Sequence, residues 1–480
     1  MGIAKKLLDR FGPERFICDP LRLEPYSRDF SLSPPQRPEG VVKVKTAEEV
    51  RFVLGVARDY SVPIVPSSSR VHFYGLTIPQ KGGLVLDLSE MDRILEIDES
   101  NRRVRIEAGV SWGKLCPALR EKGLRVMMPL FPHPLRSVIT DLLEREPLVN
   151  TVYEYGEPLQ GMEVVWPNGE IFRTGSASTP GYPDSIAGGV NPTGPGIDFY
   201  RLLQGAQGTL AVVTWASLKI ETLPKIDKLF FVPLSNLSQG LAFLSTILRL
   251  RVGQECFLLN RRVLSLILNR GGGGADGELP THAIFIVLSG LQRRPELKIA
   301  YEEALLREAL KNWFPEERVL EEIPHGPPPG EFVKGLRSPW PDPETYWKHR
   351  WKKGCQSLFF LTKPSRVERF AEIVKDMANS FGYEGEDIGL YLQPIEHNRA
   401  CHLEFHFYYD PEDGSERERI QILFREGVRR CLAEGAFFTR PYGEASTLVF
   451  ERASAYARAL KKVKAVFDPL QLMNPGRLCF

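Results

Sequence analysis

The residues best suited to chemistry lie in three separate parts of the chain. Ser67, Ser68 and Ser69 begin a loop of small residues. The loop continues through Arg70 and ends at Gly75. Its hydroxyl and backbone N–H groups are hydrogen-bond donors, the guanidinium adds a forked positive charge, and glycine permits close approach of the backbone. The loop therefore predicts a binding site for a pyrophosphate; a surface loop between two strands is the alternative interpretation.

A second loop contains Gly205 and Gly208, three positions apart. Glycines at such a spacing let the backbone approach a flat ring or a phosphate, and the apolar strand expected at residues 210–214 would keep the loop rigid. Thr209 and Val213 belong to this loop and its strand. A tight turn before a buried strand is the alternative.

A row of polar residues forms the third place. His402, Glu404 and His406 alternate with apolar residues, so they project from one face of a strand. Such a row could bind a divalent metal, act as a general base, or form the polar face of a sheet. Three ligands on one strand seldom point at one ion, so we assign no metal site. Tyr391 and His397 are secondary candidates nearby.

The elements that must position these residues follow from hydrophobic periodicity. Thr46 and Glu49 form a capping-box pattern that opens a helix. A strand follows the serine loop, whereas a helix follows the common phosphate-binding glycine loops. The predicted elements are strand 41–45, helix 46–60, strands 62–65, 84–88, 94–98 and 103–110, helix 112–122, strands 229–234 and 283–288, and helices 241–251, 301–314 and 366–381. A flexible loop is predicted at 271–274 and a Gly/Pro linker at 325–330.

Composition limits the class of protein. The chain has 480 residues, 43% of them hydrophobic, which predicts a globular protein of two or three domains. A net charge of +2 gives no indication of nucleic acid or an anionic membrane as a partner. No apolar stretch is long enough to span a membrane, so a soluble, cytoplasmic protein is expected. The seven scattered cysteines form no C-x-x-C pair, which argues against disulfides, an iron–sulfur cluster or structural zinc.

The order of several motifs resembles a known family. The segments VVKVKTAEEV, VPIVPSSSR, GGLVLDLSEM and RVRIEAGVSWGKL resemble the FAD-binding domain of the vanillyl-alcohol oxidase / p-cresol methylhydroxylase (PCMH) flavoproteins, whose relatives include D-lactate and glycolate dehydrogenases. An Asn-Gly hairpin at 161–175, the Gly205 loop and a closing motif at 467–477 follow in family order.

The resemblance implies an α+β fold, with a two-subdomain PCMH-type FAD-binding domain and an α+β cap domain. The expected division is an N-terminal arm at 1–40, the FAD domain at 41–220, the cap at 221–436 and a returning segment at 437–480. Residues 129–147 depart from the family pattern, because Ile139 and Thr140 stand where glycines are expected.

The resemblance also implies site residues. Arg440 would stabilise the reduced, anionic flavin, and the Tyr442 hydroxyl would meet the substrate, with a packing role as the alternative. His72 stands where some members bond a histidine covalently to the flavin; an ordinary loop histidine is the alternative. The implied FAD contacts are Ser67, Ser68, Ser69, Arg70, His72, Tyr74, Gly75, Ser137, Gly205, Gly208, Thr209, Val213, Arg440 and Asn474.

The implied activity is transfer of hydride from an alcohol or a 4-alkylphenol to flavin N5, with a cap residue or a tyrosine taking the proton. Oxidation of a 2-hydroxy acid such as D-lactate or glycolate is one alternative. A non-catalytic, flavoprotein-like scaffold in an electron-transfer complex is another. The expected partners are a small-molecule substrate and a protein electron acceptor, namely a cytochrome, an iron–sulfur protein or an electron-transferring flavoprotein. Oligomerisation is left open.

Overall fold

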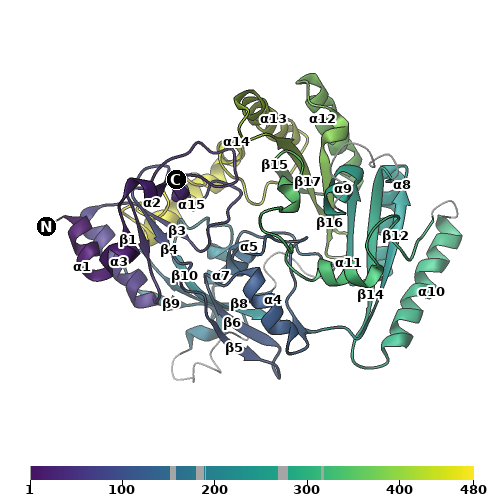
Figure 1. Cartoon of the computed structure of the whole chain (residues 1–480), viewed down its shortest axis with the longest axis horizontal. Helices are drawn as coiled ribbons and strands as arrows, with labels where there is room; N and C mark the ends of the chain where they lie inside the picture. Colours follow the sequence, from purple (N-terminus) through teal and green to yellow (C-terminus); the bar gives the residue numbers. More distant parts are fainter. Residues whose placement is uncertain (1, 152–157, 180–188, 190, 269–278, 315–317) are drawn as a thin grey trace.

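The structure is a computed structural model, and it describes residues 2–151, 158–179, 189, 191–268, 279–314 and 318–480. Its two largest sheets lie toward opposite ends of an elongated molecule, as Figure 1 shows. Its mixture of helices and strands is that of the α+β fold expected from the sequence. The predicted division of the chain into four segments stays a prediction.

A small, mainly parallel sheet carries the serine loop. It has the order β1-β2-β4-β3, where β1 is Phe16–Ile17, β2 is Gly40–Lys43, β3 is Ile64–Ser67 and β4 is Leu84–Asp87. Helix α3 (Ala47–Tyr60) connects β2 to β3 and buries Val50, Val53 and Leu54. Its N-terminus is capped as predicted, because Thr46 Oγ1 accepts a hydrogen bond from Glu49 N at 3.2 Å.

The second sheet is antiparallel, with the order β5-β6-β10-β8-β9. Its strands are β5 (Ile94–Asp98), β6 (Arg103–Glu107), β8 (Leu159–Val165), β9 (Ile171–Arg173) and β10 (Val212–Lys219). The predicted Asn-Gly hairpin is the β8–β9 pair. Helices α4 (Trp112–Arg120), α5 (Val138–Leu143) and α7 (Phe199–Leu203) share one apolar core with this sheet. A two-stranded ribbon, β7 (Leu124–Arg125) with β11 (Glu221–Thr222), lies at its margin.

The third sheet has six antiparallel strands in the order β12-β14-β13-β16-β17-β15. These are β12 (Ile226–Leu234), β13 (Glu255–Asn260), β14 (His282–Gly290), β15 (Gly354–Thr362), β16 (Gly389–Ile395) and β17 (Ala400–Tyr409). Helices α8 (Leu237–Arg249), α10 (Pro295–Trp313), α12 (Val367–Ser380) and α13 (Gly414–Ala433) pack on one face. The other face packs on α9 (Arg261–Ile267), α11 (Pro329–Leu336) and residues of the 129–149 segment. This second face is where the two halves of the molecule meet.

The C-terminal segment returns to the first sheet, as the yellow ribbon in Figure 1 shows. Helices α14 (Glu444–Arg452) and α15 (Ser454–Phe467) lead into it. Ile64 N donates to Leu472 O, and Asn474 N donates to Ile64 O, each at 2.8 Å. The chain end therefore lies against β3, directly beside the start of the serine loop.

Some local predictions need correction or lie outside the described residues. The segment 129–147, which departs from the family pattern, contains helix α5. The predicted linker at 325–330 is only partly a linker, since α11 begins at Pro329. The glycine loop predicted at 271–274 lies outside the described residues. Helices α1 (Ile3–Arg15) and α2 (Pro20–Leu23) occupy the N-terminal region.

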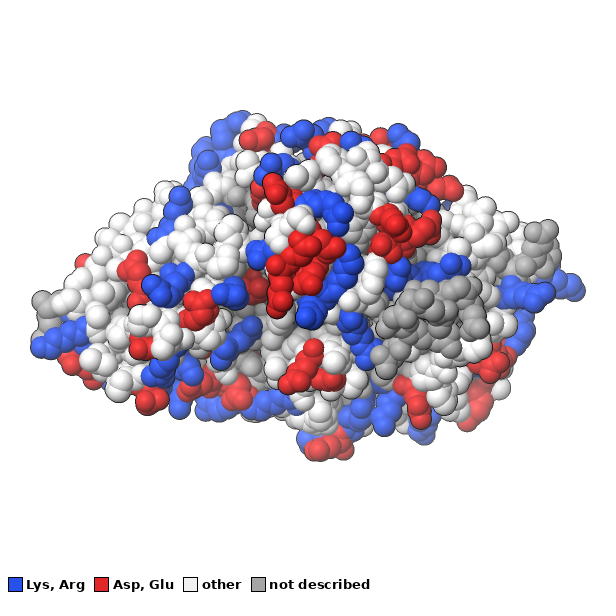
Figure 2. Space-filling view, turned by 45° about the horizontal axis from the view of Figure 1, so that its top comes forward, with Lys and Arg blue, Asp and Glu red and all other residues white. Residues whose placement is uncertain are grey.

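The surface carries both signs of charge. On the face shown in Figure 2, acidic and basic side chains are interspersed, with an acidic cluster beside basic side chains near the centre. None of the described helices combines the length and apolar character needed to cross a membrane.

Candidate active site

The serine loop and the glycine loop lie on the same cavity. The cavity is lined by Pro66, Ser68 and His72 from the first loop and by Gln207 and Gly208 from the second. Helix α5 and Asn474 complete its wall, and most of the other lining side chains are apolar: Leu76, Leu88, Ala108, Leu203, Ala206, Ala211 and Val213. An apolar slot with a few polar groups at its margin is typical of cofactor sites. The two turns are therefore placed so that one dinucleotide could contact both.

The glycines allow the two loops to approach closely. Gly208 has φ +69, and a Cβ atom there would lie 2.6 Å from Pro66 Cγ, so any side chain at this position would force the loops apart. Gly75 has φ +75, and a Cβ atom there would lie within 2.1 Å of Ser33 Oγ. Gly205 also has positive φ, and it faces the Arg145 guanidinium.

Asn474 ties these loops together. Its Nδ2 donates to Gln207 O at 2.8 Å and to Leu76 O at 3.1 Å. Its Oδ1 is buried and has no hydrogen-bond partner in the part of the chain described. A buried acceptor without a partner is unfavourable, and a donor of a bound cofactor would satisfy it. The apolar lining and the available polar groups of the cavity thus fit FAD.

The residues of the serine loop have different surroundings. Ser68 bonds to the hydroxyl of Thr140 and lines the cavity. Ser67 and Ser69 use their hydroxyls within the loop, toward Ser69 O and Val71 O. The exposed side chain of Arg70 points elsewhere, with its guanidinium 5.4 Å from the centre of the Tyr26 ring.

His72 is buried beside the cavity, with Nε2 2.5 Å from Ser69 O. Burial, together with the neighbouring Arg136 charge, lowers the pKa of His72 to about 3. The imidazole is therefore neutral at neutral pH.

Two of the other predicted cofactor contacts use their hydroxyls within the fold. Ser137 is the N-cap of α5, and its Oγ accepts from Thr140 N at 3.2 Å and donates to Ala108 O at 2.6 Å. Thr209 Oγ1 donates to Ala206 O at 2.6 Å. Ile139 and Thr140, which stand where glycines were expected, line the cavity from α5.

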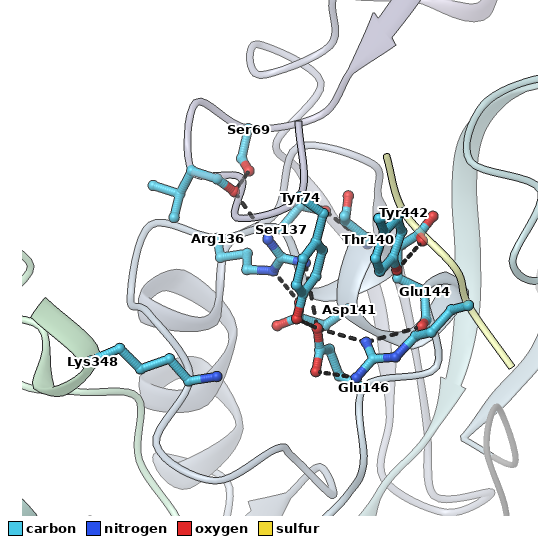
Figure 3. Close-up of polar contacts among 12 residues, drawn as sticks. Ser69, Tyr74, Arg136, Ser137, Thr140, Asp141, Glu144, Glu146, Lys348 and Tyr442 are labelled. Atoms are coloured by element: carbon cyan, nitrogen blue, oxygen red, sulfur yellow. Dashed lines mark hydrogen bonds and ion pairs between the residues drawn. The ribbon is translucent and has the colours of Figure 1, made fainter. Parts of the chain in front are cut away.

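Arg440 and Tyr442 both donate hydrogen bonds to Glu144, the residue that follows α5. Tyr442 Oη donates to Glu144 Oε2 at 2.6 Å, and Glu144 itself lines the cavity. Arg440 Nη1 lies 2.7 Å from Glu146 Oε1, and Nη2 donates to Oε2 at 2.9 Å. Tyr74 Oη also donates to Glu146 at 2.6 Å, as the dashed contacts in Figure 3 illustrate.

The electrostatics of this cluster separate its two glutamates. Burial raises the pKa of Glu144, although the Tyr442 hydrogen bond opposes the shift. Burial alone would raise the pKa of Glu146, but the charge and hydrogen bond of Arg440, together with the Arg136 and Lys348 charges, outweigh it and lower the pKa to about 2. Burial and the adjacent Glu144 raise the pKa of Tyr442 well above its usual value. Glu144 is the better proton acceptor, and Glu146 is a fixed negative charge.

A smaller cavity lies where the six-stranded sheet faces α5. Arg136, Asp141 and Glu146 line it from one side, and Lys348 and Glu404 from the other. Lys348 Nζ donates to Glu404 Oε1 at 2.9 Å, and Arg136 is ion-paired with Asp141. Figure 3 shows Lys348 reaching toward the cluster from a separate segment of the chain.

The His402, Glu404 and His406 row faces this junction from β17, as the alternation predicted. His402 Nε2 lies 3.1 Å from Glu404 Oε2, and His406 Nδ1 lies 2.9 Å from Ser357 Oγ. Within the described ranges, no three His, Cys, Asp or Glu side chains are grouped so that they could hold a metal ion. The Lys348 ammonium supplies the positive charge next to Glu404.

The two secondary candidates, Tyr391 and His397, lie in different places. Tyr391 lines the smaller cavity and donates to Gln393 Oε1 at 2.9 Å. His397 lies in the connection between β16 and β17, where its backbone N–H donates to Thr151 O at 2.8 Å.

Five charged residues of the cluster were not predicted from the sequence. Four of them, Arg136, Asp141, Glu144 and Glu146, lie within the departing segment 129–147. Charged residues embedded in an apolar stretch were an available signal for them. No such signal marked Lys348, because it lies beside a tryptophan in a run of basic residues.

Comparison with known proteins finds similar sequences and similar structures. Residues 38–175 match the model described as FAD binding domain. The glycolate oxidase subunit GlcD of Bacillus subtilis (strain 168) is 25% identical, over 99% of this chain and 96% of the relative. The 4-cresol dehydrogenase [hydroxylating] flavoprotein subunit of Pseudomonas putida is 22% identical, over 99% and 95%.

Among solved structures, substrate-bound p-cresol methylhydroxylase has a TM-score of 0.87 and covers 100% of this chain and 96% of its own, at 19% identity. That likeness establishes the fold. The sequence relatives and the domain match identify FAD as the cofactor and oxidoreduction as the activity. The chain therefore has an FAD-binding domain and the PCMH-type fold, and the relatives named above are similar to it along nearly its whole length.

Proposed function

We propose that this protein oxidises an alcohol or the benzylic C–H group of a 4-alkylphenol-type substrate. The observation that carries the proposal is the position of Glu144 in the wall of the FAD cradle, with Tyr442 and Arg440 both hydrogen-bonded to it. Bound FAD would supply the hydride acceptor, flavin N5. The Ser68, Gly208 and Asn474 side of the cradle would hold the dinucleotide, and α5 would lie beside its ring.

Tyr442 and Glu144 supply a route for the proton. A substrate hydroxyl would give its proton to Tyr442 Oη, while the Tyr442 proton moves over the 2.6 Å hydrogen bond to Glu144 Oε2. A carboxylate of raised pKa is suited to this role, because it holds a proton more readily than an exposed glutamate. Arg440 is fully buried on the same side, where its guanidinium pairs with Glu146.

Oxidation of a 2-hydroxy acid is the second candidate. The name of the Bacillus subtilis relative, a glycolate oxidase subunit, supports it about as well as the name of the Pseudomonas putida relative supports the phenol. A non-catalytic scaffold has no comparable support among these relatives.

A protein electron acceptor is also part of the proposal. The Pseudomonas putida relative is named as the flavoprotein subunit of its enzyme, which supports a separate partner for this chain too. Among the possible electron acceptors, we propose a cytochrome.

The test is anaerobic mixing of the FAD-containing protein with 4-ethylphenol, benzyl alcohol, glycolate and D-lactate, followed by flavin absorbance. We expect bleaching by at least one of the first two. If dithionite bleaches the flavin but none of the four compounds does, the proposal fails. Bleaching by glycolate or D-lactate alone would favour the second candidate.

A further inference from the structure

A cavity of about 460 Å³ adjoins the Tyr74–Tyr442 pair. Six aromatic rings line it, and its polar groups include the neutral side chains of Gln80, Gln356 and Gln421. Among the described residues that line it, only Arg440 and Glu444 carry charge. Glu444 already pairs with Arg425, whose Nε lies 2.9 Å away. The remaining question is whether Arg440 is available to a ligand.

Arg440 is occupied by the chain itself. Both terminal nitrogens of its guanidinium contact the Glu146 carboxylate: Nη1 lies 2.7 Å from Oε1, and Nη2 lies 2.9 Å from Oε2. The same carboxylate accepts the Tyr74 hydroxyl at 2.6 Å. A forked cation beside a phenolic donor is a good site for a carboxylate or a phenolate, and here Glu146 fills that site.

The arginine and lysine side chains that line the smaller cavity are also neutralised. Arg136 pairs with Asp141, and Lys348 pairs with Glu404. An anionic ligand that took Arg440 from Glu146 would leave an ionised carboxylate buried without its main partner, which is strongly unfavourable. An uncharged ligand requires no such exchange.

We propose that Glu146 is a specificity-determining residue: as a built-in counter-anion for Arg440 and Tyr74, it makes the site accept uncharged hydroxyl compounds and reject carboxylates and phenolates. This inference rests on the proposed function and narrows its substrate class. It favours a neutral alcohol or a protonated phenol over a 2-hydroxy acid, because the acid would bring a carboxylate into a cavity whose cation is already paired.

The test compares binding of benzamide and benzoate, which have similar shape and differ in charge, to the FAD-containing protein. Isothermal titration calorimetry at neutral pH measures both without turnover. We expect benzamide to bind the wild type about tenfold or more tightly than benzoate. In Glu146→Gln the Arg440 charge is released, so benzoate should gain about tenfold and the preference should reverse.

Glu255→Gln is the matched control. Glu255 is a buried glutamate that pairs with Arg125 and Arg337 away from both cavities, and its substitution should leave the preference unchanged. Equal or tighter binding of benzoate by the wild type, no binding of benzamide, or an unchanged preference in Glu146→Gln would each overturn the proposal. The wild-type comparison decides the matter even if Glu146→Gln does not fold. Because no turnover is measured, a failure here is distinct from a failure to oxidise substrates.

Discussion

Replacing Tyr442 with phenylalanine tests the proton route directly. The substitution removes the hydroxyl that donates to Glu144 Oε2 but keeps the ring that stacks on Tyr74, with centroids 4.3 Å apart. Glu144 then loses a hydrogen bond inside the protein, so the free energy of unfolding should fall by about 1.5–3 kcal/mol. Loss of a positioned acid–base group typically lowers the rate by about 10²–10⁴-fold, and we expect flavin reduction to slow by that factor.

The assay is stopped-flow reduction of the flavin by the substrate that bleaches the wild type, with denaturant unfolding measured in parallel. Tyr383→Phe serves as a control, because Tyr383 is a buried tyrosine whose hydroxyl contacts the Tyr408 backbone, remote from the Tyr442–Glu144 pair. The FAD content of Tyr442→Phe should equal that of the wild type. Reduction of Tyr442→Phe at the wild-type rate would refute the assigned role.

Three further predictions concern the cradle and its charges. Gly208→Val should lower the affinity for FAD at least tenfold, because its Cβ would meet Pro66. Gly55→Ala, whose added Cβ would have no atom within 4 Å, should leave FAD affinity unchanged. Equal FAD affinities of Gly208→Val and the wild type in a fluorescence titration would contradict the prediction. Acid precipitation should release the flavin into the supernatant, because the His72 Nε2 atom is already hydrogen-bonded to a loop carbonyl; colour retained in the pellet would instead show a covalent bond. The free energy of unfolding should fall as pH drops from about 4.5 to about 2, because Glu146 stays ionised to a lower pH in the folded state than in the unfolded state. In acid denaturation, Glu146→Gln should lose less stability over that range than the wild type.

Local patterns predicted the elements that depend on neighbouring residues. The Thr46 cap, the Asn-Gly hairpin and the single-face row at His402, Glu404 and His406 all form as expected, because spacing along the chain determines them. The strand of that row is buried on both faces, which alternation alone does not reveal.

The contacts that make up the candidate site are of another kind. Arg440 and Glu146 are 294 residues apart, and Lys348 and Glu404 are 56 apart, so only the tertiary fold brings them together. Family order indicated Arg440, but no sequence pattern indicated that a glutamate would pair with it. Ser137 was expected only as an FAD contact, and its role as the N-cap of α5 was not predicted because no helix was predicted at 138–143.

The central claim is that the serine loop, the glycine loop and Asn474 together hold one FAD. Its most direct test is the absorption spectrum of the purified protein, with the flavin quantified after release or, if it is covalently bound, in the denatured protein. We predict the two flavin bands and one FAD per chain. A colourless protein that also fails to bind added FAD would contradict the account.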